Sequence, residues 1–313
     1  MRLDGIHHIT AITGDAPRNV DFYARVLGLR LVAKSVNQDD PSVYHLFYAD
    51  EHAQPGADLT FFEYPGAIPG RAGAGMVHTI LLRVGVAEAL EFWADRLVAE
   101  GVTVERPAGR VRFADPEGLA YEILVTEAPD APLIADHPEI PAEHALQGFE
   151  GVRAYSARPE QSAPLLERIG GGRRLDAATW ELRGDTRGAT IAYDPPPEAP
   201  GRQSAGTVHH LAWGTTQAEH SRWAGVLDAA GIPHSGLIDR HYFHSIYFRE
   251  PSGVLFEIAD DGPGFTVDGP VEELGRRIIL PPRLEPHRER IEAGLTPLPD
   301  PRADWPPVSG FRP

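Results

Sequence analysis

The chain has 313 residues and a formal net charge of −16, and it contains no cysteine. The length favours two domains over one, and the negative charge argues against nucleic acid as a partner. Without cysteine there is no disulfide or thiolate metal site, so any metal must be bound by His, Asp, Glu or water. No apolar run reaches the roughly 18 residues that a membrane-spanning helix needs, and the first residues lack the apolar core of a secretory signal. We therefore expect a cytoplasmic enzyme that does not associate with a membrane.

A pattern of one strand, one helix and further strands recurs four times along the chain. The first copy begins with Gly5-Ile-His-His-Ile-Thr and enters a helix that Gly28 ends. Strand-like runs follow at residues 43–48 and 58–64. The elements predicted for the second copy are a strand from Met76, a helix at 87–100 and a last strand at 120–125.

The third and fourth copies follow a Pro-rich linker at residues 127–147. The third has a strand near Gly151, a helix near 163–169 and a last strand at 190–193. The fourth has a strand from Thr207, a helix at 220–230 and a last strand at 254–259. We thus predict a pair of modules in residues 1–128, a second pair in 148–262, and a tail at 263–313 that packs on the surface.

The last turn of the second copy matches that of the fourth. Asp115-Pro-Glu-Gly118 precedes Glu122, and Glu250-Pro-Ser-Gly253 precedes Glu257. Proline followed by glycine favours a tight turn that leads into the final strand. The pattern therefore places a glutamate at the same point of two final strands.

Two double histidines, His7-His8 and His209-His210, each open a module, and Glu257 lies in the final strand of the fourth. Two neutral imidazoles and one carboxylate can form a facial metal triad, which leaves coordination positions open and suits Fe(II) chemistry with O2. Successive residues of a strand point to opposite faces, so only one histidine of each pair can face a common site directly. Periodicity alone does not say which.

Four βαβββ modules with histidine and glutamate on their edge strands resemble the vicinal-oxygen-chelate superfamily, which includes glyoxalase I, extradiol dioxygenases and bleomycin-resistance proteins. Two motifs, Gly5-Ile-His-His-Ile-Thr and Tyr44-His-Leu-Phe-Tyr-Ala-Asp50, and the segment from Asp239 to Glu257 are similar to ring-cleaving dioxygenases of hydroquinone type. The resemblance covers nearly the whole chain. It implies an α+β fold in which the four modules form two half-open β-barrel cups.

The resemblance also implies a ligand set of His8, His210 and Glu257. These residues belong to the first and fourth modules, so we expect those two modules to share one cup and the second and third to share the other. The implied cofactor is Fe(II), with Mn(II) as the alternative metal. The implied partners are a small aromatic diol and O2, and the oligomeric state stays open.

Further residues match positions around the metal in the resembled family. Tyr247 and Arg240 match residues that hydrogen-bond the substrate and stabilise negative charge. Three more residues match positions that orient the ligands or bind the substrate edge, namely His7, Thr10 and His209. The competing interpretation is an ordinary surface position for Arg240 and ordinary packing for Tyr247, and the other three residues have an equally ordinary alternative.

Other candidate ligands are weaker. Glu63 ends the first module much as Glu257 ends the fourth, and a four-ligand site of glyoxalase I type would use both. His78 aligns with His209 rather than His210 and should not face a metal. Glu122 aligns with Glu257 but has no histidine at the matching position, so it is expected to be solvated or salt-bridged. Roles for His241, Tyr242 and His244 stay unassigned, and the residues expected in the core are Phe22, Leu27, Trp93 and Trp223.

The leading hypothesis is an Fe(II)-dependent, extradiol-type dioxygenase that cleaves the ring of a hydroquinone or catechol. A second is a metal-dependent isomerase or lyase like glyoxalase, which Glu63 as a fourth ligand would favour. A third is a resistance protein that binds an aromatic drug or quinone. That function needs no metal triad, so the presence of His8, His210 and Glu257 argues against it.

Overall fold

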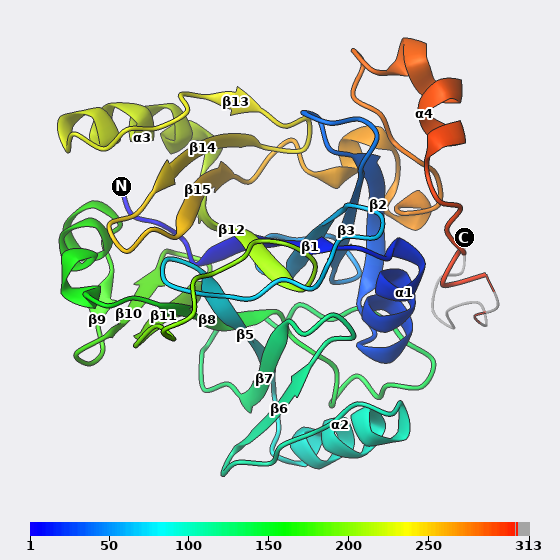
Figure 1. Cartoon of the computed structure of the whole chain (residues 1–313), viewed down its shortest axis with the longest axis horizontal. Helices are drawn as coiled ribbons and strands as arrows, with labels where there is room; N and C mark the ends of the chain where they lie inside the picture. The colour runs from blue at the N-terminus through cyan, green and yellow to red at the C-terminus, as the bar shows by residue number, and fades with distance from the viewer. Residues whose placement is uncertain (304, 306–313) are drawn as a thin grey trace.

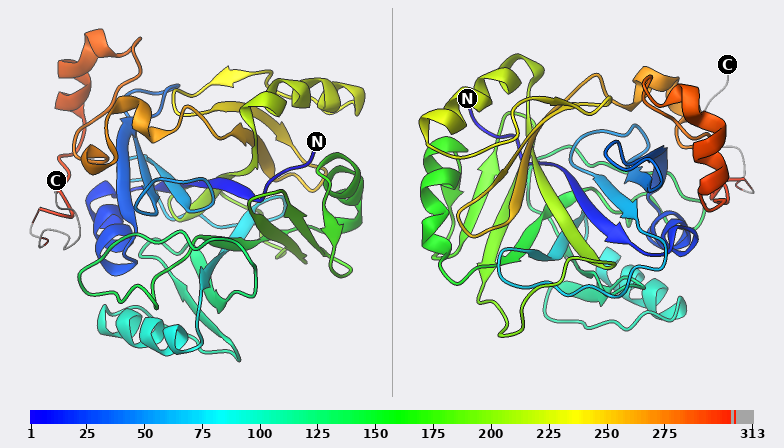
Figure 2. Two further views of the ribbon diagram at one scale, coloured as in Figure 1. Left: turned by 180° about the vertical axis from the view of Figure 1, so that it is seen from behind. Right: turned by 45° about the horizontal axis from the view of Figure 1, so that its top comes forward.

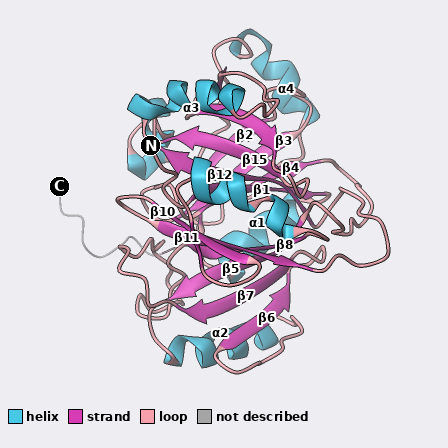
Figure 3. Cartoon of the chain, turned by 90° about the vertical axis from the view of Figure 1, so that its left-hand side faces the viewer, coloured by secondary structure: helices cyan, strands magenta, loops and turns pink. Residues whose placement is uncertain are grey.

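Two curled sheets make up most of the molecule and lie one above the other, with α3 and α2 at the two outer ends of the stack (Figures 1 and 3). The computed structural model describes residues 1–303 and 305. In that part of the chain no helix is long and apolar enough to cross a membrane.

The first and fourth modules share one eight-stranded sheet, in the order β13-β14-β15-β12-β1-β4-β3-β2. Its strands are β1 (Ile6–Thr13), β2 (Arg30–Val36), β3 (Tyr44–Ala49), β4 (Asp58–Glu63), β12 (Thr207–Thr215), β13 (Ile238–Asp239), β14 (His244–Arg249) and β15 (Leu255–Asp260). Strands β1 and β12 pair in antiparallel fashion and join the two modules, as the crossing of blue and yellow-green strands in Figure 1 shows. The expected pairing of the first module with the fourth is confirmed.

The second and third modules share a seven-stranded sheet, in the order β6-β7-β5-β8-β11-β10-β9. Its strands are β5 (Val77–Val84), β6 (Arg110–Ala114), β7 (Ala120–Val125), β8 (Phe149–Tyr155), β9 (Arg173–Arg174), β10 (Thr179–Arg183) and β11 (Gly188–Asp194). Here β5 and β8 form the antiparallel junction, so the two sheets repeat one plan. The division of the chain into units at 1–128, 148–262 and 263–313 stays a prediction.

Glycines end the helices where the sequence predicts. Gly28, Gly101 and Gly231 have φ values of 71°, 77° and 69°, a conformation that glycine adopts without steric cost. The helices are α1 (Ala16–Val20), α2 (Glu88–Ala99), α3 (Gln217–Ala229) and α4 (Arg288–Gly294), with π-helical turns at Asp21–Val26 and Pro164–Ile169 and 3-10 turns at Pro159–Gln161, Phe265–Asp268, Val271–Glu273 and Glu285–His287. The first helix thus continues as a π-helix, and α3 begins three residues before the predicted start at 220.

Apolar helix faces pack on the sheets and form the core. The four side chains predicted there are all at most 3% exposed: Phe22, Leu27, Trp93 and Trp223. Burial of such large side chains removes apolar surface from water and stabilises the packing of helix on sheet.

The C-terminal segment lies along β2, as the orange and red ribbon beside the blue strand shows in Figure 2. The backbone N–H of Ile279 donates to the carbonyl of Lys34 at 2.8 Å, and the Lys34 ammonium donates to the carbonyl of Arg276 at 3.1 Å. Phe265 packs against Phe47 and Tyr242, with ring centroids 5.2 and 4.4 Å away. The segment therefore covers one edge of the eight-stranded sheet and takes part in shaping the cup.

Candidate active site

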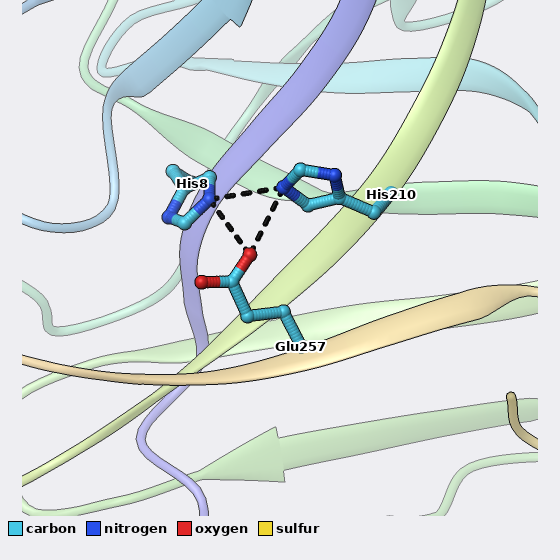
Figure 4. A group of neighbouring side chains, drawn as sticks. All are labelled: His8, His210 and Glu257. Carbon is cyan, nitrogen blue, oxygen red and sulfur yellow. Dashed lines mark hydrogen bonds and ion pairs between the residues drawn. The ribbon is translucent and has the colours of Figure 1, made fainter. Parts of the chain in front are cut away.

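Three side chains converge inside the cup of the eight-stranded sheet: His8, His210 and Glu257 (Figure 4). Nε2 of His8 lies 3.3 Å from Nε2 of His210, and Oε2 of Glu257 lies 3.2 Å and 2.9 Å from these two nitrogens. All three residues are buried. Residues separated by up to 249 positions in sequence thus direct one donor atom each to a common point.

The register of three adjacent strands produces this convergence. Glu257 on β15 pairs with Ala212 on β12, which pairs with His8 on β1, so the three form one row across the sheet. His210 lies two residues from Ala212 and faces the same side. Because alanine is small, the middle of the row leaves space between His8 and Glu257.

A β-bulge accompanies each double histidine. The β1–β12 register skips His7 on one strand and His209 on the other, so each is an extra, unpaired residue. Bulges re-aim side chains and occur often beside active sites. Here they bring the rings of neighbouring residues together, with Nδ1 of His7 2.9 Å from Nδ1 of His8, and Nδ1 of His209 2.8 Å from Nδ1 of His210.

These contacts are compatible with His8 and His210 each presenting a free Nε2. Burial lowers the pKa of His7 and of His209 to about 3, so both rings are neutral at pH 7. A neutral ring with its proton on Nε2 accepts at Nδ1, and the adjacent His8 or His210 then donates from Nδ1 and keeps a lone pair on Nε2. Such a partner fixes the tautomer of a metal-binding histidine.

The electrostatics of Glu257 fit a bound cation. Its side chain is fully buried, and neither carboxylate oxygen accepts a hydrogen bond that satisfies normal geometry from the described residues. Burial alone would raise its pKa, but His8 and His210 hold that pKa well below its ordinary value, so the carboxylate is ionised. A buried charge is costly unless it is paired or binds a metal. Two imidazole nitrogens and this carboxylate supply the donor set for a divalent ion.

A pocket of about 230 Å³ opens over His8 and His210. Its wall includes His8 and His210, the aromatic rings of Phe47 and Phe62, and the tail residue Pro281. Apolar and aromatic walls with a few polar groups are typical of sites for small organic ligands. The tail therefore contributes to the pocket as well as to the surface.

Tyr247 and Arg240 lie beside the three converging side chains. Tyr247 pairs with Glu257 across β14 and β15, and its ring stands edge-on to His210 with centroids 5.6 Å apart. Nε of Arg240 donates to the Tyr247 hydroxyl at 3.2 Å, and Arg240 also pairs with Asp39 at 3.1 Å. Burial raises the pKa of Tyr247 above its ordinary value, so its hydroxyl stays protonated and can donate.

The other predicted site residues separate into two groups. His209 lines the pocket together with Tyr247 and Arg240. His7 and Thr10 are 4% and 0% exposed and are not among the residues that line the pocket. The hydroxyl of Thr10 is bonded to that of Thr60 at 2.8 Å, so Thr10 acts on the site only through neighbours.

Glu63 does not reach the site. The residue of the first module that corresponds to Glu257 is Thr60. Glu257 pairs with Ala212, which lies two residues after His210. In the same way, Thr60 pairs with Thr10, which lies two residues after His8. Glu63 lies three residues further and faces the opposite side of the strand. Its Oε1 accepts from the backbone N–H of Ala16 at 2.9 Å, at the start of α1. The four-ligand arrangement is therefore absent among the described residues.

The equivalent positions of the second sheet are occupied differently. His78 binds Asp194 at 2.9 Å and stacks on Tyr155, with ring centroids 3.9 Å apart. Glu122 pairs with Arg112 at 2.7 Å and also with Arg110. The expected salt bridge of Glu122 is confirmed, and the expectation that His78 does not face a metal stays a prediction.

The three residues without an assigned role lie in the loop before β14 and at the first position of that strand. His241 binds Asp268 at 2.9 Å, and His244 binds Asp260 at the same distance. Tyr242 is 4% exposed and packs on Phe265. His241 and Tyr242 also line the pocket, which the sequence did not indicate.

Sequence reasoning missed one further histidine. His45 lines the pocket from β3, and Nε2 of its ring lies 2.9 Å from the hydroxyl of Thr60. It stands in the Tyr44–Asp50 motif, and the alternation of that strand would have placed it on the face opposite Tyr44 and Leu46.

Comparison with known proteins agrees with this architecture. A family model described as Glyoxalase/Bleomycin resistance protein/Dioxygenase superfamily matches residues 5–123. A protein of Bacillus subtilis (strain 168) named putative ring-cleaving dioxygenase MhqA is 40% identical over 318 residues, which cover 95% of this chain and 100% of that protein. The chain belongs to the glyoxalase/dioxygenase superfamily.

Two more proteins match along most of their length. A chlorohydroquinone/hydroquinone 1,2-dioxygenase of Sphingobium indicum is 31% identical over 308 residues, covering 93% of this chain and 95% of that protein. A crystal structure of a putative dioxygenase from Bacillus subtilis superposes with a TM-score of 0.88 at 39% identity, over 95% of this chain and 98% of the other. The resemblance seen in the sequence and the expected α+β fold of paired βαβββ modules are both confirmed.

Proposed function

We propose that this protein is an Fe(II)-dependent dioxygenase that uses O2 to cleave the ring of a hydroquinone- or catechol-type aromatic. The observation that carries the proposal is the convergence of His8, His210 and Glu257 beneath a pocket with aromatic walls. The names of two relatives, the putative ring-cleaving dioxygenase of Bacillus subtilis and the chlorohydroquinone/hydroquinone 1,2-dioxygenase of Sphingobium indicum, support the same kind of reaction.

His8, His210 and Glu257 would hold the metal through Nε2, Nε2 and a carboxylate oxygen. Fe(II) in such a two-histidine, one-carboxylate site keeps open positions and supplies electron transfer between an aromatic diol and O2. Mn(II) suits the same donors, so the metal has to be identified by loading. His7 and His209 hold the ligand rings in the required tautomer through the Nδ1 contacts.

The remaining residues bind and orient the substrate. Phe47 and Phe62 offer apolar faces for the aromatic ring. The protonated Tyr247 hydroxyl donates a hydrogen bond to a substrate oxygen, and Arg240 stabilises the negative charge of that oxygen. The ring then opens beside the carbon that bears this oxygen.

The isomerase alternative has lost the feature that favoured it. A four-ligand site needs a second carboxylate, and the corresponding position holds Thr60 while Glu63 binds the start of α1. The three donors that do converge leave the coordination positions that an aromatic diol and O2 both require.

The direct test is anaerobic loading with Fe(II), followed by measurement of O2 uptake against a panel of hydroquinones and catechols. We expect one O2 consumed per ring opened and a product that absorbs differently from the substrate. Parallel loading with Mn(II), Zn(II) and Ni(II) separates the metals. Turnover with Zn(II) or Ni(II) in the absence of O2 would contradict a dioxygenase.

Two glutamates provide a matched pair of variants. Glu257→Gln removes the charge that offsets the cation, so we expect loss of bound iron and of O2 uptake. Glu63→Gln makes the same chemical change on the outer face of the first module, where the side chain contacts Ala16. It should bind iron like the wild type, although α1 loses part of its N-terminal stabilisation. Full activity in Glu257→Gln would rule out the assignment.

A further inference from the structure

His45 stands on the side of the pocket that carries no metal-binding residue. The three ligands lie on β1, β12 and β15, whereas His45 lies on β3, which β4 separates from β1. Adjacent strands are about 4.8 Å apart, so β3 runs about 10 Å from β1 across the sheet. Tyr44 and Leu46 are 3% and 0% exposed, but the His45 side chain is partly exposed and lines the pocket.

Three contacts hold the His45 ring in one orientation. Phe47 lies two residues along the same strand, with ring centroids 3.9 Å apart. Phe62 is the cross-strand partner, with centroids 4.4 Å apart. The hydroxyl of Thr60 lies 2.9 Å from Nε2, and that hydroxyl is itself bonded to Thr10. A ring fixed in this way loses little freedom when a ligand binds.

One nitrogen of this fixed ring remains available. Nδ1 makes no hydrogen bond to any described residue, and it is not among the fully buried polar atoms without a partner. It is therefore accessible from the pocket that His45 lines. A phenolic hydroxyl both donates and accepts, so it can bond to Nδ1 in either tautomer of the ring.

We propose that His45 binds the substrate hydroxyl that is remote from the metal, and that it thereby selects a 1,4-dihydroxybenzene over a 1,2-dihydroxybenzene. The inference rests on the proposed function in that the substrate is a dihydroxybenzene. A catechol carries its two oxygens on neighbouring carbons, so both lie at the metal. A hydroquinone carries its second oxygen across the ring, on the side where His45 lies. Thr60 and Thr10 are positioning residues that orient the His45 ring.

The test is anaerobic calorimetric titration of the Fe(II)-loaded protein with hydroquinone, catechol and phenol. For the wild type we expect hydroquinone to bind more tightly than phenol, because phenol lacks the second hydroxyl. His45→Leu should weaken hydroquinone binding about 10- to 100-fold, the effect of leaving one polar group without a partner, and should change phenol and catechol binding less than about threefold. Iron content should not change. His52→Leu, the same substitution at an exposed histidine, is the control and should leave all three affinities unchanged.

The hydroxyl chain has its own pair of variants. Thr60→Val keeps the shape of the side chain but removes the bond to His45, so it should reduce the preference for hydroquinone over phenol about 3- to 10-fold. Thr60→Ser restores a hydroxyl and should restore the preference. This pair tests the inference even if His45→Leu does not fold.

The outcomes separate the inference from the proposed function. Equal losses for hydroquinone and phenol in His45→Leu would show a packing role and overturn the inference, as would loss of iron in that variant. If the wild type takes up no O2 but prefers hydroquinone in a His45-dependent way, the proposed function fails and the inference stands. If the wild type cleaves rings and His45→Leu keeps the same preference, the inference alone fails.

Discussion

Removing the hydroxyl of Tyr247 tests whether this side chain acts on the substrate. In Tyr247→Phe the ring keeps its edge-on contact with His210, and only the oxygen that accepts from Arg240 at 3.2 Å is lost. Removing an oxyanion-hole donor costs about 10²–10³-fold in other enzymes. A bound metal takes up part of the substrate's negative charge, so the lower range for a hydrogen bond to a charged group applies, about 1.5–3 kcal/mol. We therefore expect kcat/KM to fall about 10- to 150-fold.

The assay is steady-state O2 uptake beside iron stoichiometry of the purified protein. Iron content in Tyr247→Phe should equal that of the wild type, since the hydroxyl is not a ligand. Tyr155→Phe, the same change in the second sheet beside His78, serves as control and should leave kcat/KM unchanged. Unaltered kinetics in Tyr247→Phe would assign the residue to packing. Loss of iron in step with activity would mean that it supports the metal site instead of the reaction.

Three other substitutions test the site and the fold. Arg240→Ala should raise KM more than it lowers kcat and leave iron bound, because the guanidinium is proposed to attract the anionic substrate. Steady-state kinetics measure both constants, and an unchanged KM would refute this role. Ala212→Leu fills the gap in the row of ligands and should lower iron affinity at least tenfold, measured by metal titration with circular dichroism to verify the fold. Asp130 lies between Arg83 and Arg183; burial alone would raise its pKa, but the two guanidiniums lower it from 3.8 to about 2. The Asp130 carboxylate contributes about 2 kcal/mol to the free energy of unfolding above about pH 4, and this contribution is lost as the pH falls from about 4 to 2. Asp130→Asn should therefore unfold at a lower urea concentration at pH 7. It should also lose less stability than the wild type between about pH 4 and 2.

The sequence predicts the modules well because each rests on a local signal. Glycines mark the helix ends, and alternating apolar residues mark the strands. The choice between His7 and His8 is different, since a strand of period two allows either one to face the cup. The β-bulges at His7 and His209 set these orientations, and a bulge depends on the partner strand, which the sequence does not show.

Glu63 illustrates how register limits such reasoning. Its place at the end of the first module made it a candidate beside Glu257, but the pairing of β1 with β4 gives the ligand position to Thr60. A difference of three residues moves a side chain to the other face of the strand. Position along the chain therefore could not distinguish a candidate metal ligand from a residue whose side chain contacts the start of a helix.

His45 and the tail escaped prediction for a related reason. The role of His45 depends on which side chains surround the pocket, and these come from both modules of the sheet and from Pro281 of the tail. Strand β2 is buried along its whole length, partly because the tail covers it at Lys34. Contacts between segments so distant in sequence produce no local hydrophobic pattern from which they could be predicted.

The meeting of the first and last strands in one sheet has a consequence for how the protein matures. His8 is among the first residues synthesised, yet its partners lie 202 and 249 positions later. The strands of the seven-stranded sheet lie within residues 77–194, so they are all synthesised before β12 and β15 leave the ribosome. Until then β1 has one open side, which is a surface for wrong pairing. Capture of the proposed metal would therefore be a late event in biogenesis, and an ion bound across β1, β12 and β15 would close a very long loop and link the two ends of the chain.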